Sequence, residues 1–505
     1  MRKGIVGLIV LAAVVLGGLG LAIVDTTSDP EVARAAGLVQ YDDCDALLDA
    51  IQAQAGEAVG PYGLDGGGFT TIAGRIDEGG AEVVEDAGAP EALAGEAEAE
   101  APATTIAPSD GADTAASAGD EEADSTEFST TNVQEEGVDE ADLVKNDGER
   151  LVTVVDGSLR VVDLTGEQPE ELGAVELPIE GVDEHGGGLE LLVSGDTALV
   201  LGVTYGGGIG PMPVEGDDFA SSVPDGSGQG VTTLVEVDLS DPASPSVVET
   251  AEVEGAYTTA RMVGDVARIV TSTYAPDLGF VYPSDGSPTA EDVAERTNRE
   301  LVEGSTLDDW LPLVAVGDAE PVPAVACDQV GLPEEASGFG TATVVTVDLS
   351  DGLGIEADSA ASVIGGSEVV YASTENLYVA TSTWPDLELL DQLEQVPGID
   401  DVESLEELDE LGDIDGTPVR EVVEEQVLPS TAVHRFALPA DGPATYEASG
   451  SVPGRMLSQF SFSEHDGHLR VATTVDDPGG STSRVTVLSV GDLAEVGSVG
   501  DIGPA

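Results

Sequence analysis

Beyond Glu127 the chain consists of short runs rich in Val, Leu and Ile, separated by Gly-Asp and similar turns. Five segments share a pattern of strand, tight turn and strand, and a second pair of strands follows each of them. The five first pairs are expected at residues 143–155, 191–204, 261–273, 369–383 and 460–475. Four strands that recur in a fixed order are typical of propeller blades. We therefore predict an all-β fold, a β-propeller of about five four-stranded repeats, over residues 127–505.

Three of the repeats carry a long insertion between their second and third strands, at residues 205–231, 274–340 and 384–430. Without these insertions, the repeats approach the ~40–50 residues of known blade repeats. Alternate loops of an up-and-down blade emerge at opposite ends of its strands, so all three insertions are expected at one end. Binding residues usually lie on loops held by a rigid scaffold, which favours this insertion-bearing end as the functional surface.

Helices are predicted at two places outside the strands. Asp42 or Asp43 can cap a short helix around Cys44, within an N-terminal segment at residues 26–78. A capping-box pattern predicts a second helix at residues 289–302, inside the second insertion.

The N-terminal end of the chain predicts export. Arg2 and Lys3 precede an uncharged run at residues 4–24. This run exceeds the ~7–15 apolar residues of a signal-peptide core and matches the ~20 residues that span a bilayer. Residues 1–25 are therefore expected to form a transmembrane anchor, with the remaining chain outside the cell membrane. A cleaved signal, which would make the protein secreted, is the alternative that stays open.

The segment at residues 79–126 has a different composition, mostly Ala, Glu, Asp, Gly, Ser, Thr and Pro. Such a segment buries too little apolar surface to offset the entropy lost on ordering, so it predicts a disordered acidic linker. The two cysteines, Cys44 and Cys327, lie on either side of it. Two cysteines in an exported chain suit one disulfide, and two separate buried thiols are the other interpretation.

One stretch of the sequence indicates a particular protein family more specifically than any of the repeats does. Residues 128–148, with the sequence FSTTNVQEEGVDEADLVKNDG, resemble the opening of a family of secreted or membrane-anchored bacterial and archaeal proteins with a C-terminal β-propeller domain. Further similar stretches lie at residues 238–242, 305–312, 434–436, 448–454 and 469–474. The resemblance implies an exported β-propeller of haloarchaeal type and brings no activity with it. Because relatives continue into further blades, we expect a truncated chain, an incomplete ring and an exposed edge on the last blade.

Charge narrows the list of partners. The 505 residues include 16 Lys and Arg against 99 Asp and Glu, for a formal net charge of −83. Such a surface repels nucleic acid and anionic lipid head groups, so neither is an expected partner. With 41% hydrophobic residues the chain can still build a large core, which puts the charge on a folded surface. We interpret this as an acidic, halophilic protein, because concentrated salt screens repulsion between carboxylates.

Acidic residues and an amide gather at the start of the first repeat. Asn132, Asp139, Glu140 and Asp142 offer oxygen atoms of the kind that coordinate Ca²⁺, which makes calcium the candidate cofactor. The other interpretation is that they cap turns in a chain that is acidic throughout. Trp310 and Trp384 lie in or beside insertions, where they would either stack on a sugar ring or pack against the propeller rim.

Two classes of function follow from these features. The predicted one is a membrane-anchored, extracytoplasmic β-propeller that acts as a binding or scaffold module, with an envelope protein or glycan as partner and no catalytic residue assigned. The alternative is a metal-assisted hydrolase or lyase that uses the insertion-bearing end. A propeller fold does not choose between them, because function depends on the residues of a site.

Overall fold

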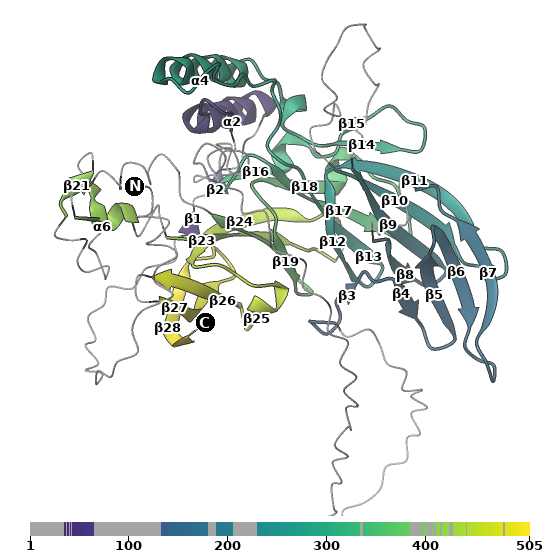
Figure 1. The fold of residues 1–505 in the computed structure, drawn as a ribbon. Helices are drawn as coiled ribbons and strands as arrows, with labels where there is room; N and C mark the ends of the chain where they lie inside the picture. The colour runs from purple at the N-terminus through teal and green to yellow at the C-terminus, as the bar shows by residue number, and fades with distance from the viewer. Residues whose placement is uncertain are drawn as a thin grey trace, which may run out of the picture. The chain divides into compact units, whose positions relative to one another are not determined.

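The computed structural model describes residues 43–64, 133–179, 188–205, 230–333, 337–383, 428–440, 442–477 and 480–504, together with short stretches between 35 and 41 and between 393 and 423. Five antiparallel sheets of four strands follow one another along the chain (Figure 1). The strand pairs expected from the sequence are all present, and the predicted β-propeller fold is confirmed.

The strands of each sheet follow in chain order. Sheet 1 contains β4 (Val144–Asn146), β5 (Arg150–Val155), β6 (Ser158–Asp163) and β7 (Glu170–Glu176). Sheet 2 contains β8 (Glu190–Ser194), β9 (Thr197–Tyr205), β10 (Gly230–Asp238) and β11 (Ser246–Glu254). Sheet 3 contains β12 (Ala256–Val263), β13 (Val266–Ser272), β17 (Thr341–Asp348) and β18 (Ala360–Ile364). Sheet 4 contains β19 (Val369–Ala372), β20 (Asn376–Thr383), β23 (Ser430–Ala437) and β24 (Thr445–Pro453). Sheet 5 contains β25 (Phe462–His465), β26 (His468–Asp477), β27 (Gly480–Ser489) and β28 (Glu495–Pro504).

Short extra strands extend the edges of three sheets. Sheet 2 gains β14 (Leu313–Val316) and β15 (Val322–Pro323); sheet 3 gains β16 (Val330–Pro333), β2 (Leu38–Val39) and β3 (Asp139–Glu140); sheet 4 gains β1 (Ala35–Ala36). Within the third insertion, β21 (Asp413–Ile414) and β22 (Thr417–Pro418) pair beside the short helix α6 (Val419–Val422). Strands β14, β15 and β16 all come from the insertion at 274–340, which therefore covers the outer edges of sheets 2 and 3.

Apolar side chains join neighbouring sheets face to face. One buried cluster joins sheets 1 and 2, a second joins sheets 2 and 3, a third joins sheets 3 and 4, and a fourth joins sheets 4 and 5. In β20, Leu377 points into the third cluster and Tyr378 into the fourth, because successive side chains of a strand point to opposite faces. Among the described residues, no such cluster joins sheet 5 to sheet 1, and Val155 and Val499 on these two sheets are exposed.

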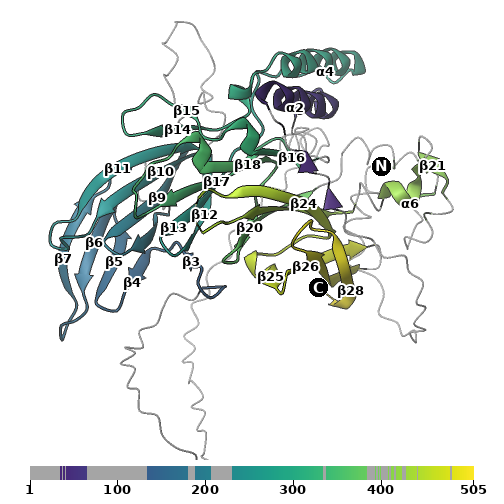
Figure 2. The ribbon, with the colours of Figure 1, turned by 180° about the vertical axis from the view of Figure 1, so that it is seen from behind.

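Two helices lie side by side at the end of the strands that carries the insertions (Figures 1 and 2). They are α2 (Cys44–Ala58), which Asp43 caps as predicted, and α4 (Pro288–Glu303). The predicted start of α4 at residue 289 was slightly late, because the Ser287 side chain accepts the capping hydrogen bond from the Ala290 N–H. Proline suits the first turn of a helix, since its missing N–H has no partner there.

A disulfide fixes α2 to the second insertion. Cys44 at the start of α2 is bonded to Cys327, with a Cα–Cα distance of 5.3 Å. Leu47 and Ile51 on the same helix are completely buried in the cluster between sheets 2 and 3. Of the two interpretations left open by the sequence, the structure therefore shows the disulfide.

Among the described residues, no helix is both long enough and apolar enough to cross a membrane. The predicted anchor or signal at 1–25 and the predicted linker at 79–126 lie outside the described residues, and both stay predictions.

Candidate functional site

The most acidic part of the signature stretch crosses the innermost strands of the sheets. We call residues 133–142 the inner strap. Its residues Asp139 and Glu140 form β3 and pair with β12, the first strand of sheet 3. Asp142 then forms a two-way backbone bridge with Leu191 on the first strand of sheet 2, at N–O distances of 3.3 and 2.8 Å. Sheet 1 begins two residues later.

The other half of the inner strap reaches the remaining two sheets. The Gln134 side-chain amide donates to the carbonyl oxygens of Gln459 and Phe462, at 3.0 and 3.3 Å, where sheet 5 begins. The hydroxyl of Tyr371, on the first strand of sheet 4, donates to Glu135 Oε1 at 2.6 Å. The inner strap thus contacts sheets 2, 3, 4 and 5 and leads directly into sheet 1, which gives the signature stretch a structural role.

Protein donors satisfy the carboxylates that suggested a metal site. Lys145 Nζ lies 2.7 Å from Asp139 Oδ1 and also donates to the Glu140 carbonyl oxygen. The Glu140 carboxylate accepts from the Gln134 N–H at 3.3 Å and lies 3.9 Å from the Arg261 guanidinium. The Asp142 carboxylate accepts from the next N–H in the chain, at 2.7 Å.

Within the described part of the chain, no group of three or more His, Cys, Asp or Glu side chains is arranged to hold a metal ion. Asn132, the remaining predicted ligand, lies outside the described residues. The two neighbouring cations, Lys145 and Arg261, would oppose the binding of a further cation. Calcium at Asn132, Asp139, Glu140 and Asp142 stays a prediction, as does the hydrolase or lyase that would depend on it.

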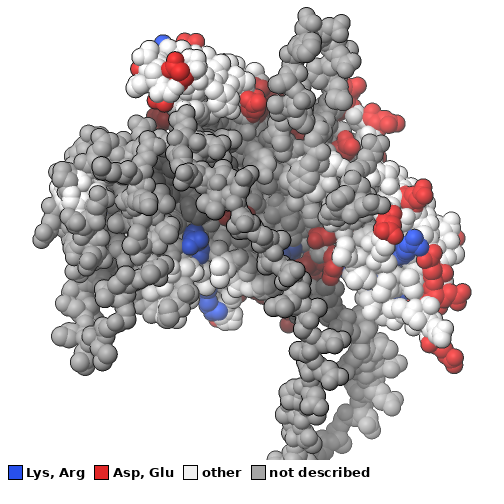
Figure 3. Space-filling view, viewed as in Figure 1, with Lys and Arg blue, Asp and Glu red and all other residues white. Residues whose placement is uncertain are grey.

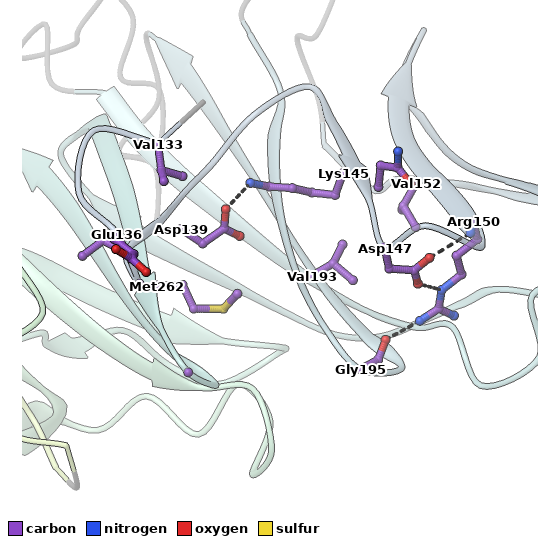
Figure 4. A pocket seen from close by; sticks show the side chains of 14 residues that line it. Val133, Glu136, Asp139, Lys145, Asp147, Arg150, Val152, Val193, Gly195 and Met262 are labelled. Atoms are coloured by element: carbon purple, nitrogen blue, oxygen red, sulfur yellow. Dashed lines mark hydrogen bonds and ion pairs between the residues drawn. The ribbon is translucent and has the colours of Figure 1, made fainter. Parts of the chain in front are cut away.

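A pocket of about 670 Å³ opens beside the inner strap (Figure 4). Sheets 1, 2 and 3 and the inner strap all contribute to its walls. Its lining residues are Val133, Glu136, Gly137, Val138, Asp139, Lys145, Asn146, Asp147, Arg150, Val152, Val193, Gly195, Met262 and Gly264. Apolar surface thus alternates with two pairs of opposite charge, which is the composition of a site for a small polar ligand.

The two charge pairs lie on different walls of the pocket (Figure 4). One is Lys145 with Asp139, and Lys145 is only 7% exposed although it is charged. The other is Arg150 with Asp147, at 2.8 Å between Nε and Oδ2, and Arg150 also donates to the Gly195 carbonyl in sheet 2. Burial alone would raise the pKa of Asp147, but hydrogen bonds from the Arg150 backbone and guanidinium hold this pKa below its usual value. The Asp147 carboxyl group is therefore ionised near neutral pH.

The pocket lies at the opposite end of the strands from the insertions. Asp147, Gly195 and Gly264 belong to the turns between the first and second strands of sheets 1, 2 and 3. The insertions instead join second strands to third strands, as predicted. The insertion at 274–340 forms α4 and three edge strands, and several of its large side chains, such as Val302 and Trp310, are buried in the cluster between sheets 2 and 3, so packing is one role of this insertion.

The sequence left two roles open for Trp310, stacking on a sugar ring or packing against the propeller rim. The structure shows that it packs. Its side chain is only 3% exposed and meets Phe339 edge to face, with ring centroids 6.4 Å apart. The indole N–H donates to Ser305 Oγ at 2.9 Å. Burial with its polar group satisfied is the usual state of a structural tryptophan. Trp384, the second candidate, lies outside the described residues.

A stacked aromatic layer between sheets 4 and 5 was missed at the level of sequence. Tyr371 stacks on Phe462 and Tyr378 at centroid distances of 5.7 and 5.9 Å. Glu464 accepts from the Tyr378 hydroxyl at 2.8 Å, and burial, followed by the charge of Glu464, raises the pKa of Tyr378. The sequence signal that could have indicated this layer is the alternation of side chains at the start of the fifth repeat, with an aromatic residue at 462 and a carboxylate at 464 on the same face of the strand.

Sheets of four antiparallel strands that stack in chain order and are tied along their first strands define a β-propeller. The chain belongs to the family described as "Beta propeller domain", whose family model matches residues 128–505.

Individual similar proteins add little to this assignment. An uncharacterized protein of Archaeoglobus fulgidus is 45% identical over 49 residues, which cover 10% of this chain and 7% of that protein. This chain therefore spans only a small part of the length of the relative that it matches. A Synechocystis apocarotenoid oxygenase variant and a chimera of that enzyme with RPE65 are each 11% identical over 72% of both chains, at TM-scores of 0.14 and 0.17. Likeness at these TM-scores carries no argument about function.

Proposed function

We propose that this chain is an extracytoplasmic binding module and that the pocket beside the inner strap holds its ligand. The observation that carries the proposal is the way in which the pocket is built. Three sheets contribute walls, and the inner strap holds the first strands of sheets 2 and 3 by backbone hydrogen bonds. A site on such a support loses little entropy when it binds, because its groups are already in place.

The lining favours a small ligand with both hydrogen-bond donors and acceptors. Lys145 and Arg150 offer donors, while Glu136, Asp139 and Asp147 offer carboxylate oxygens. A zwitterion matches both kinds of group, with its cation toward the carboxylates and its anion toward the ammonium and guanidinium groups. A polyanion is disfavoured, because the chain as a whole carries a net charge of −83.

The Cys44–Cys327 disulfide supports an extracytoplasmic location, since such bonds persist in oxidising compartments. The uncharged run at residues 4–24 supports membrane anchoring or secretion, and the acidic composition supports an envelope in concentrated salt. An envelope protein or glycan remains the proposed partner of the scaffold as a whole.

A pocket-filling variant tests the proposal. In a thermal-shift screen of the full chain with amino acids and glycine betaine as probes, at least one probe is expected to raise the melting temperature. Val193→Trp should abolish that rise, because the indole would occupy the pocket. Val248→Trp, an equal change at an exposed position of the same sheet, should leave the rise intact. A rise that survives Val193→Trp, or no rise with any probe, would refute the proposal.

A further inference from the structure

At the insertion-bearing end, far along the strands from the pocket, two tyrosines lie together on the surface. We propose that Tyr62 and Tyr282 form a platform that binds the neutral sugar units of a glycan. The inference rests on the proposed binding function and deepens it, because it gives the glycan partner a surface that is separate from the pocket. It rests on how the two rings are supported, how far Tyr282 is exposed and which charged residues lie close to it in the sequence.

The two rings come from segments far apart in the sequence. Tyr62 lies in the turn that follows α2, and Tyr282 lies in the insertion shortly before α4. Their ring centroids are 6.4 Å apart, and the ring planes are tilted by 49°. Two rings at this distance and tilt form a shallow, bent apolar surface rather than a closed core contact.

Asn298, a completely buried residue of α4, sets the spacing of the two segments. Its Oδ1 accepts from the Val281 N–H at 2.8 Å, and its Nδ2 donates to the carbonyl oxygens of Val281 and Gly60, both at 3.1 Å. One amide group therefore binds the residue before Tyr282 and the turn that carries Tyr62. A buried amide with its hydrogen bonds made in this way is costly to move.

The turn under Tyr62 is itself closely determined. Gly60 and Gly63 exchange two backbone hydrogen bonds, at 3.0 and 3.2 Å. Gly63 has a φ of +96°, and a Cβ atom there would lie 3.0 Å from the ring of Phe280. Only glycine fits this turn without strain, so Phe280 can pack closely beneath it. The platform therefore sits on a rigid base that the Cys44–Cys327 disulfide anchors through α2.

Rigid support is unusual for side chains that remain in water. Tyr282 is 66% exposed and the adjacent Val281 is 40% exposed, in a chain whose aromatic content is only 4%. Exposed tyrosines that are held in place provide large contact area at a low cost in conformational entropy. Most of the surface of Tyr282 therefore stays in contact with solvent and is available to a ligand.

The surroundings favour a neutral, hydroxyl-rich ligand. Asp277 and Asp285 flank the ring of Tyr282 in the sequence, and both are exposed. Their carboxylate oxygens can accept hydrogen bonds from sugar hydroxyls, while their charge repels phosphate, sulfate and uronate groups. The apolar C–H face of a pyranose ring stacks on an aromatic ring, and the hydroxyls at its edge reach the polar groups beside it.

Saturation-transfer NMR on the full chain in concentrated salt tests the platform, with maltohexaose, cellohexaose and chitohexaose as neutral probes. We expect transfer from the protein to at least one of these sugars. Tyr282→Ala and Tyr62→Ala should each weaken that binding about tenfold or more, whereas Tyr282→Phe should keep most of it, because the ring remains. Phe460→Ala, which removes an exposed ring from the short helical turn before sheet 5, is the matched control and should leave binding unchanged.

Two further measurements distinguish this proposal from the pocket proposal and from binding of a cationic peptide. Val193→Trp should leave sugar binding intact, so failure of the pocket proposal and failure of the platform proposal are distinguishable. A hexa-arginine peptide, added as a cationic probe, should not compete with the bound sugar. The proposal would be overturned by transfer to none of the three sugars, or by binding of the peptide in place of the sugars. It would also be overturned if the two alanine variants, with melting temperatures equal to that of the unaltered chain, bound the sugar as tightly as that chain does.

Discussion

Lys145 and Asp139 are six residues apart, yet their ion pair joins two different sheets, since Asp139 extends sheet 3 and Lys145 belongs to sheet 1. The distance from Nζ to Oδ1 is 2.7 Å, and the lysine side chain is almost completely buried. This pair holds the inner strap where it turns from the middle of the propeller into its first repeat. It also explains why a chain with so few lysines keeps one here.

Lys145→Met tests how much this ion pair stabilises the fold. The change leaves Asp139 partly buried without its cation, and we expect the free energy of unfolding to fall by about 1–3 kcal/mol. Urea denaturation of both proteins measures the difference. The double variant Asp139→Asn with Lys145→Met should recover part of the loss, because it removes the unpaired charge. An unchanged midpoint for Lys145→Met would mean that the pair does not hold the strap.

The disulfide between Cys44 and Cys327 predicts a response to reducing agent. It links residues separated by 283 positions, so its loss frees a long loop in the unfolded chain. The double variant Cys44→Ser with Cys327→Ser should lose about 2–5 kcal/mol of stability. Thermal melts with and without reductant are the measurement: reductant should lower the melting temperature of the unaltered chain toward that of the variant. An equal melting temperature for all samples would contradict the prediction.

The repeats were predictable from sequence because their signal is local. Each consists of short apolar strands around a turn, and strand segments packed on both faces, such as residues 377–380, are almost entirely apolar. The insertion positions and both main helices follow from similarly local patterns. The cap of α2 at Asp43 depends only on its own first turn.

The arrangement of the site was not predictable, because its partners are distant in sequence. Gln134 hydrogen-bonds to Gln459, 325 positions away, and no local pattern encodes that contact. The sequence also did not show that Lys145 and backbone N–H groups bind the acidic residues of the strap, because these contacts depend on how the strap folds across the sheets. Whether Trp310 lies inside or outside likewise depends on how its insertion folds back onto the sheets.

Gly331 in β16 predicts a steric cost. A Cβ atom at this position would lie 2.1 Å from the buried ring of Tyr446, on β24 of sheet 4. Gly331→Ala must displace that ring, and we expect a loss of about 1–3 kcal/mol, as for other overpacked positions. Gly56→Ala is the matched control: this helical glycine has open space around it, and alanine should add about 0.5–1 kcal/mol. Chemical denaturation that shows equal effects for the two changes would contradict the clash.

The net charge of −83 predicts that salt stabilises the fold. Carboxylates repel one another over a Debye length of about 10 Å at 0.1 M salt and about 3 Å at 1 M. The melting temperature should therefore rise steadily as NaCl increases over this range. KCl should act similarly, because screening depends on ionic strength. A melting temperature independent of salt would show that the acidic surface does not limit stability.

His434 predicts how stability changes with pH. Burial lowers the pKa of this imidazole to about 4, and its ring nitrogens lie 3.4 Å from Ser337 Oγ and 3.3 Å from the Tyr446 hydroxyl. In the unfolded chain a histidine has a pKa of about 6.5, so between these values the unfolded state binds the extra proton. The free energy of unfolding should therefore fall as the pH drops from about 6.5 to about 4, by about 3 kcal/mol in total, and this contribution should level off below.

His434→Gln removes the titrating group and should flatten this part of the pH profile, whatever it does to stability at neutral pH. His468→Gln, the same change at an exposed position, should keep the slope of the unaltered chain. Denaturant melts at half-unit steps between pH 7 and pH 4 measure both. Carboxyl groups such as Asp147 have a lowered pKa in the folded chain. Their contribution to stability is lost as the pH falls from the unfolded value of about 3.9 through the lower folded value, which is below the range in which His434 acts. A slope that persists in His434→Gln would assign it to other groups, because a glutamine cannot take up the proton.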